Sequence, residues 1–73
     1  MPLNAADKKF LKEMVPHHKM AVKMADAVIK EGSDMRVDGL ARVIRDGQAK
    51  EIAQMEGWLK EVGEKPNGSM GGM

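Results

Sequence analysis

The chain has 73 residues, of which 12 are basic and 11 acidic, and it contains no cysteine. A chain of this length forms one domain at most and buries only about 60% of the surface that it exposes when unfolded. Without cysteine it has no disulfide or thiolate site to stabilise a small core, which leaves self-association and metal binding. The near-even charge and the scarcity of aromatic residues, which are Phe10 and Trp58, argue against a nucleic-acid-binding protein. No segment approaches the roughly 20 apolar residues of a membrane span.

A first helix is predicted at about residues 5–31. Asn4 is a favourable N-cap residue, and Asp7 places negative charge in the first turn of the helix. Gly32 follows Lys30 and predicts a left-handed residue that ends the helix. Pro16 lies inside the predicted helix, where it removes one backbone hydrogen bond at a cost of about 3 kcal/mol.

A second helix is predicted at about residues 34–62, with Ser33 or Asp34 as its N-cap. Gly63 and Pro66 end it. Because the connection between the helices is short, they fold back on each other as an antiparallel hairpin over residues 4–63. The glycine- and methionine-containing tail, residues 64–73, is expected to be flexible.

Both predicted helices carry a broad apolar face at the helical repeat. On the first helix it contains Phe10, Leu11, Met14, His17, His18, Ala21, Met24, Ala25, Val28 and Ile29. On the second it contains Val37, Leu40, Ala41, Ile44, Gln48, Glu51, Ile52, Met55, Trp58, Leu59 and Val62. Two faces of this width cannot cover each other completely. The sequence therefore predicts an all-α fold in which two hairpins dimerise into a four-helix bundle.

Polar residues interrupt these apolar faces at one level of the hairpin. They are His17, His18, Gln48 and Glu51, and burial without partners would cost several kcal/mol for such groups. Counting from the turn places His17 opposite Gln48, His18 opposite Gly47 and Met14 opposite Glu51. We expect both imidazole rings to point inward, with Gln48 and Glu51 accepting the ring N–H groups and fixing the tautomers.

Methionine is unusually abundant, with eight residues in the chain. Met14 lies three and four residues before the two histidines, Met24 lies one heptad beyond His17, and Met20 lies on the flank of the same helix. Thioethers and neutral imidazole suit copper(I), whereas zinc prefers Cys, His and carboxylate, and a di-iron bundle needs several inward glutamates. The predicted metal ligands are Met14, His17, His18, Met24, Met20 and Met55. Met24 and Met55 taken singly are more typical of core residues than of metal ligands. Met70 and Met73 indicate either a second, weak copper site or incidental tail residues.

The same residues resemble a known family. Phe10-Leu11, Met14-Val15-Pro16-His17-His18, Ala21 and Met24 are similar to its first-helix signature. Leu40-Ala41, Ile44, Gln48, Glu51-Ile52, Met55 and Trp58-Leu59 are similar to its second. This is the ferritin-like family catalogued as domain of unknown function 305, which includes CopM-type copper-binding proteins. The resemblance implies a helical bundle, copper binding and copper tolerance in exported bacterial proteins, with Met14, His17, His18 and Met24 on the metal side and Met55 as a possible contributor.

We therefore predict a copper(I)-binding protein, not an enzyme, that sequesters or transfers the ion as a homodimer. A copper chaperone or exporter is a candidate partner, and neither nucleic acid nor a membrane is expected. Thioethers remain usable in oxidising compartments, which favours a periplasmic or secreted protein, although no leader is visible and a cytoplasmic location stays open. Two alternatives remain. One is a structural or interaction dimer module whose buried His–Gln–Glu network holds no metal. The other is a redox metalloenzyme, for which Glu51 is the single inward carboxylate.

Overall fold

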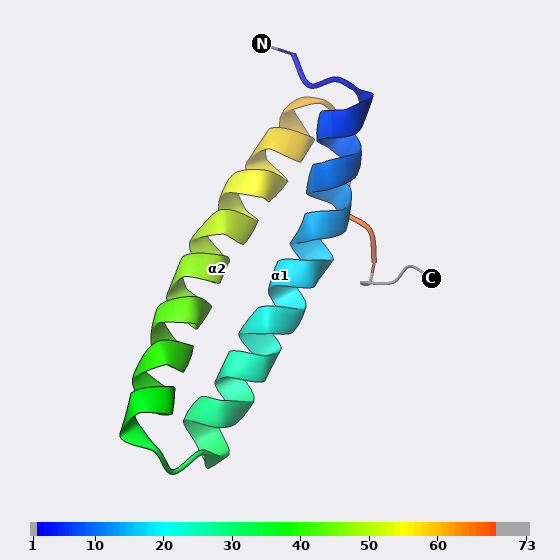
Figure 1. Cartoon of the computed structure of the whole chain (residues 1–73). Coiled ribbons are helices and arrows are strands. Elements are labelled where there is room, and N and C mark those ends of the chain that lie inside the picture. Colours follow the sequence, from blue (N-terminus) through cyan, green and yellow to red (C-terminus); the bar gives the residue numbers. More distant parts are fainter. Residues whose placement is uncertain (1, 69–73) are drawn as a thin grey trace.

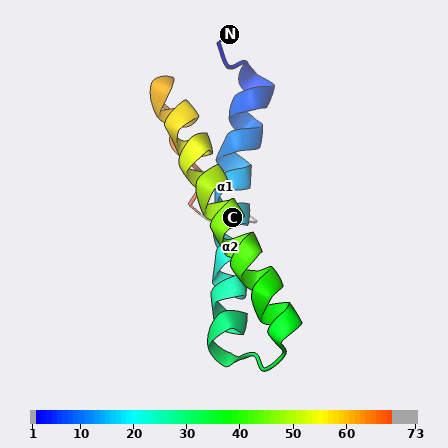
Figure 2. The same ribbon diagram turned by 90° about the vertical axis from the view of Figure 1, so that its left-hand side faces the viewer.

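Two long helices joined by a three-residue connection make up the protein. The computed structural model describes residues 2–68, so Met70 and Met73 lie outside the described residues. Helix α1 spans Ala5–Glu31 and helix α2 spans Met35–Glu61, and the two run antiparallel (Figure 1). The predictions of an all-α fold and of a two-helix hairpin are confirmed. The second view shows that the helices cross instead of running side by side along their whole length (Figure 2).

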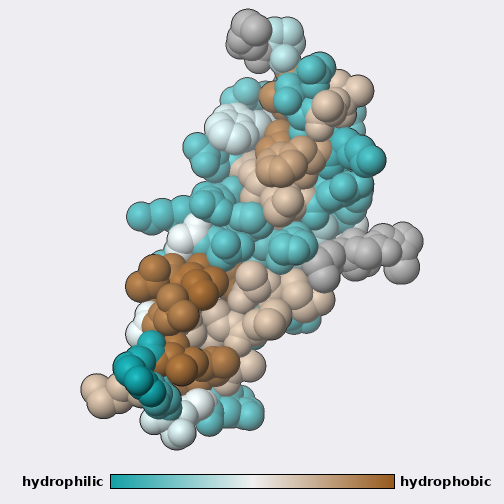
Figure 3. Space-filling model, viewed as in Figure 1, coloured by the Kyte–Doolittle hydropathy of each residue, from teal (hydrophilic) through white to brown (hydrophobic). Residues whose placement is uncertain are grey.

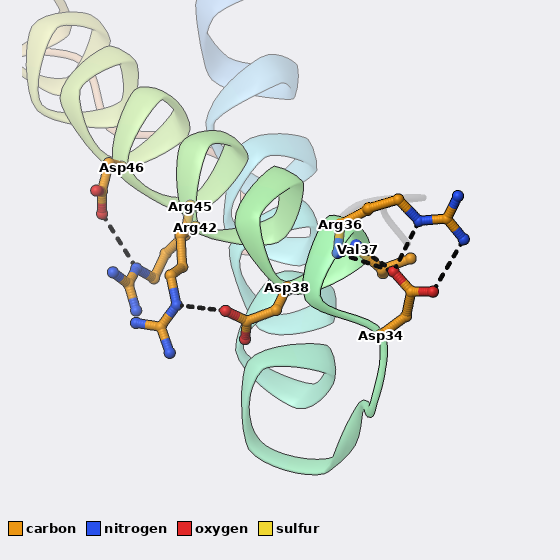
Figure 4. Close-up of polar contacts among 7 residues, drawn as sticks. All are labelled: Asp34, Arg36, Val37, Asp38, Arg42, Arg45 and Asp46. Atoms are coloured by element: carbon orange, nitrogen blue, oxygen red, sulfur yellow. Dashed lines mark hydrogen bonds and ion pairs between the residues drawn. The ribbon is translucent and has the colours of Figure 1, made fainter.

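Side-chain caps determine where both helices begin. Asn4 accepts a hydrogen bond from the backbone N–H of Asp7, and the Asp7 carboxylate accepts one from the backbone N–H of Asn4. At α2 it is Asp34, and not Ser33, that accepts from the N–H groups of Arg36 and Val37 (Figure 4). These contacts satisfy backbone donors that have no partner inside a helix.

The prediction of a left-handed residue at Gly32 is wrong. Its backbone is extended, with φ −74° and ψ 163°, and its N–H donates to the carbonyl of Val28 at 2.7 Å. A Cβ atom at Gly32 would lie 2.7 Å from the same carbonyl oxygen, so the chain needs glycine here for a close approach. The left-handed glycine follows the other helix, at Gly63, where φ is 71°.

The core lies at the end of the hairpin away from the connection. Leu11 and Val15 of α1 pack there against Met55 and Leu59 of α2. Nearer the connection, Ala25 and Ala41 are buried. Small side chains at that level allow the two helices to approach closely, but they bury little apolar surface.

Much of the predicted apolar surface stays uncovered in the single hairpin. Phe10 is 57% exposed and Met24 65% exposed. Other large apolar side chains with substantial exposure are Met20, Val37, Leu40, Ile44, Trp58 and Val62. The molecule measures 44 × 27 × 15 Å, a single layer of two helices. The predicted faces are therefore present, but several of their largest apolar side chains, most of them on α2, do not pack against the other helix.

The first residues of the predicted flexible tail pack against α1. Pro16 has no N–H group, so it leaves the carbonyl of Lys12, four residues earlier, without a donor inside the helix. The backbone N–H of Asn67 donates to that carbonyl at 3.0 Å. The Lys12 ammonium group also pairs with Glu64 at 3.1 Å. The chain end returning from α2 thus occupies the backbone position that Pro16 leaves open.

Neither helix is apolar over a length sufficient to cross a membrane, as judged from the described residues.

Candidate metal centre

His18 and Glu51 form a polar contact between the two helices, as do Lys19 and Glu56, whose ion pair measures 3.1 Å. The Nε2 atom of His18 lies 2.6 Å from Oε1 of Glu51. The His18 side chain is 14% exposed, whereas that of Glu51 is 57% exposed. The other ring nitrogen of His18, Nδ1, is buried and has no hydrogen-bond partner. One imidazole is therefore held at the helix interface by a carboxylate that reaches in from solvent.

The predicted alignment of Met14 with Glu51 is wrong, because His18 takes that position. Counting residues from the turn ignores the direction of the side chains. In every helix the Cα–Cβ bonds tilt toward the N-terminus. In this antiparallel pair the α1 side chains therefore lean away from the turn, and the α2 side chains lean toward it. His18 consequently meets a residue about one turn farther along α2 than its Cα position suggests.

His17 is exposed, so the expectation that both imidazole rings point inward is wrong for the single hairpin. The reason is geometric. Consecutive helical residues point about 100° apart, and the interface of α1 passes through Leu11, Val15 and His18. His17 is thereby turned onto the open flank of the hairpin. The predicted contact between His17 and Gln48 is not formed in the structure, although Gln48 is half-buried.

The predicted methionine ligands fall into two groups. Met55 is buried in the core, and Met14 is half-buried and packs against it. Met20 and Met24 are exposed, at 43% and 65%. A single hairpin thus does not bring all the predicted ligands into one pocket. It separates an interior group, which includes His18, from an exterior group, which includes His17.

His17, Met20 and Met24 form what we term the donor strip. They are spaced by three and four residues, which places them on successive turns of α1, with neighbouring Cβ atoms about 5–6 Å apart. All three are exposed, so one imidazole and two thioethers face outward along one side of the helix. Long, flexible methionine side chains can converge from such positions on one soft cation.

Harder ligand sets are not assembled in the same way. Over residues 2–68, no three side chains drawn from His, Asp and Glu lie close enough together to hold a metal ion. The His18–Glu51 pair supplies two such groups.

An apolar groove near the turn was not predicted. It has a volume of about 250 Å³, and its lining includes Met24, Val28, Val37, Leu40, Ala41 and Ile44. Figure 3 shows an apolar area over this end of the hairpin and a hydrophilic band across the middle of the same face. The excess width of the two predicted faces was the available signal. It indicated uncovered apolar surface but not where that surface would form a groove.

Comparison with known proteins identifies the family. Residues 7–73 match the family described as "Domain of unknown function (DUF305)". The chain belongs to this family. The DUF305 match contains the donor strip, the His18–Glu51 pair and nearly all of both helices. It confirms the resemblance of the two helical signatures to domain of unknown function 305.

A relative of this DUF305 chain is the uncharacterized protein L153 of Acanthamoeba polyphaga mimivirus. The two are 38% identical over 55 residues, which cover 75% of this chain and 36% of the viral protein. The chain thus spans little more than a third of that relative's length. No solved structure matches the chain.

Proposed function

We propose that this protein binds copper(I) and sequesters or transfers the ion without catalytic turnover. The observation that carries the proposal is the donor strip, in which His17, Met20 and Met24 are exposed on successive turns of α1. Exposed thioethers beside an imidazole form a soft ligand set. Copper(I) accepts such a set, whereas zinc favours Cys, His and carboxylate, and magnesium and calcium favour oxygen.

His18 supports the same proposal from the interior. Its Nδ1 atom is buried without a partner, and Met14 lies one turn earlier on the same helix. A buried nitrogen without a partner is unfavourable, and a bound cation is one way to satisfy it. In this arrangement Glu51 holds the His18 ring and fixes its orientation. Gln48 and Met55 remain candidates for a supporting role at this level.

The proposal extends to assembly. The radius of gyration is 14.2 Å, whereas a compact chain of this length has one of about 11 Å. An open single layer with exposed Phe10, Leu40 and Trp58 is better explained as half of a four-helix bundle than as a complete fold. We therefore propose a homodimer, of the ferritin-like kind that the family resemblance implies. The resemblance to CopM-type proteins also favours a periplasmic role in copper tolerance, with a copper chaperone or exporter as partner.

The proposal is tested by anaerobic titration of the protein with copper(I) against a competing chelator. Replacing Met20 and Met24 together by Leu removes sulfur with little change in volume. We expect the affinity for copper(I) to fall more than about tenfold, because even groups that only support a metal ligand contribute 10–100-fold. Met35→Leu is the matched control, since Met35 is also an exposed methionine but lies at the start of α2.

Two results would contradict this proposal. If the unsubstituted protein does not compete with the chelator for copper(I), the protein does not bind the ion in the proposed way. If the Met20/Met24 double variant binds as tightly as the Met35→Leu control, the donor strip is not the site. A His17→Ala variant then shows whether an imidazole of the strip contributes.

A metal-free structural module is the second candidate, and the His18–Glu51 contact favours it. A short polar contact at the edge of an apolar interface can specify the pairing of helices without any ligand. The two candidates differ in their thermal unfolding. A ligand that binds the folded protein raises its melting temperature, so copper(I) stabilises a copper-binding protein and leaves a metal-free module unchanged.

A further inference from the structure

The open face of the hairpin repeats the same spacing on both helices. On α1, Phe10 and Met24 each lie seven residues from His17, and on α2, Trp58 and Ile44 each lie seven residues from Glu51. Seven residues are close to two helical turns, so each set stays on one side of its helix, with members about 10 Å apart along the axis. Phe10, Met24, Ile44 and Trp58 are all substantially exposed. On each helix, an aromatic residue thus lies two turns from the central polar residue in the direction away from the connection, and an aliphatic residue lies two turns from it in the direction of the connection.

The two ends of this face have complementary shapes. At the end near the turn, Met24 and Ile44 belong to the lining of the 250 Å³ groove. At the opposite end, Phe10 and Trp58 expose large aromatic rings, 57% and 44% respectively. The hydrophilic band lies between these two ends (Figure 3). A groove and a pair of aromatic side chains therefore lie about equally far from the level of His17 and Glu51.

The exposed surface is larger than that of a compact protein of the same mass. The whole chain exposes 5523 Å², whereas a compact protein of this mass exposes about 4,450 Å². The excess of roughly 1,000 Å² compares with the approximately 800 Å² that each partner buries in a stable interface of standard size. The excess is therefore comparable with the area that one partner buries in such an interface.

We propose that a second copy of this chain packs face to face on the open face, with its hairpin pointing in the opposite direction. The turn end of each copy then lies on the aromatic end of the other, an arrangement that we call end-to-end packing. In this arrangement, which rests on the dimer proposed above, a two-fold axis passes across the hairpin at the level of His17 and Glu51. Phe10 and Trp58 of each copy then fill the groove of the other, and α1 lies against α1 of the second copy. His17 of one copy meets His17 of the other, so that the two donor strips meet at their His17 ends.

The pattern itself favours this direction over the alternative. If the two copies ran in the same direction, groove would face groove and leave a void, while the four aromatic rings would crowd at the other end. End-to-end packing instead places a bulky side chain opposite each groove. It also brings the imidazoles and carboxylates of the two copies into one central layer, apart from the apolar contacts at the two ends.

Cysteine crosslinking tests the direction, because the chain has no native cysteine. The experiment uses the full chain, free of copper, under mild oxidation. Disulfides form when Cα atoms lie within about 7 Å, so a His17→Cys variant is expected to form a disulfide dimer efficiently. Lys23→Cys, an exposed site on another side of α1, is the matched control and should crosslink poorly.

A second pair leaves His17 and the two aromatic residues of the proposed contact unchanged. Glu13 and Ala21 lie four residues before and after His17. End-to-end packing places Glu13 of one copy level with Ala21 of the other, so a mixture of Glu13→Cys and Ala21→Cys proteins should crosslink. Each variant alone should not, because its own pair would be separated by about 12 Å along the axis.

The outcomes separate this inference from copper binding. The end-to-end arrangement is overturned if the His17→Cys protein crosslinks no more efficiently than the Lys23→Cys protein. It is also overturned if the Glu13→Cys protein crosslinks with itself as efficiently as it does with the Ala21→Cys protein. Sedimentation of the unsubstituted chain as a monomer at micromolar concentration overturns it as well. Because these measurements contain no copper, none of them depends on the copper(I) titration, and each proposal can fail without the other.

Discussion

The contact between Asn67 and Lys12 provides a quantitative test of how the chain accommodates Pro16. A proline inside a helix costs about 3 kcal/mol relative to alanine, partly because the carbonyl four residues earlier loses its donor. The Asn67 N–H replaces that donor at 3.0 Å. A typical hydrogen bond contributes about 1 kcal/mol net. Replacing Asn67 by Pro removes the N–H, so Asn67→Pro should lower the free energy of unfolding by about that amount.

A double-mutant cycle with Pro16→Ala isolates this effect. Alanine at position 16 restores the N–H within the helix, which then donates to the Lys12 carbonyl. In that background Asn67→Pro should have almost no effect, giving a coupling energy of about 1 kcal/mol between the two positions. Changes in the packing of the buried Pro16 ring occur in both Pro16→Ala variants and cancel in the cycle.

Urea unfolding monitored by circular dichroism measures all four proteins. For a domain of this size, 1 kcal/mol also corresponds to about 4–8 °C in melting temperature. Gly68→Pro is the control for placing a proline in this segment, because it leaves the Asn67 N–H in place. The reasoning is refuted if Asn67→Pro destabilises the unsubstituted protein and the Pro16→Ala variant equally.

Three further changes have expected outcomes. Leu40→Asp should weaken dimerisation about tenfold or more, as measured by sedimentation, because Leu40 is 59% exposed in the single chain and is buried only by a second copy. The helical circular dichroism of the hairpin should stay unchanged. Loss of helix content would instead place Leu40 in the hairpin's own core. Glu51→Gln should lower the free energy of unfolding by no more than about 1 kcal/mol, since Glu51 is more than half exposed, and a much larger loss in urea unfolding would mean that the contact is desolvated. Hydrogen bonds from the Arg36 side chain, and then from the N–H groups of Arg36 and Val37, hold the pKa of Asp34 below its ordinary value of 3.8. The stabilisation from this cap is therefore complete above pH 3.8 and is lost as the pH falls through the lower folded-state pKa. The difference in melting temperature between Asp34→Asn and the unsubstituted protein should thus shrink in acid, and a difference that stays constant down to about pH 2 would contradict this assignment.

The sequence predicts the helices well because their ends depend on local chemistry. Asn4 and Asp34 are short polar residues placed directly before periodic apolar segments, and both act as caps in the structure. Gly32 shows where local rules fail. The residue type was informative, but the reason for glycine is a close approach to the Val28 carbonyl, which depends on the direction in which the chain leaves α1.

The candidate site was less predictable, because it depends on a rotation of about 100° between adjacent residues. The apolar face of α1 is wide enough to include both His17 and His18, so its pattern does not show which of them meets the other helix. Leu11 and Val15 pack against α2, and His18 lies on the same side of α1, so it is His18 that lies at the interface. The tilt of side chains toward each helix N-terminus then selects Glu51 as its partner.

The exposed position of His17 links the two proposals thermodynamically. His17 belongs to the donor strip and also lies at the centre of the face that we assign to the second copy. If a bound copper(I) ion takes ligands from both copies, it binds the dimer more tightly than the monomer, and dimerisation must raise the copper affinity by the same factor. If instead each strip binds its own ion, copper(I) and the second copy compete for the same side of α1. The dependence of the dimer dissociation constant on copper(I) therefore reports whether the site is shared, since a shared site tightens the dimer and a competing one weakens it.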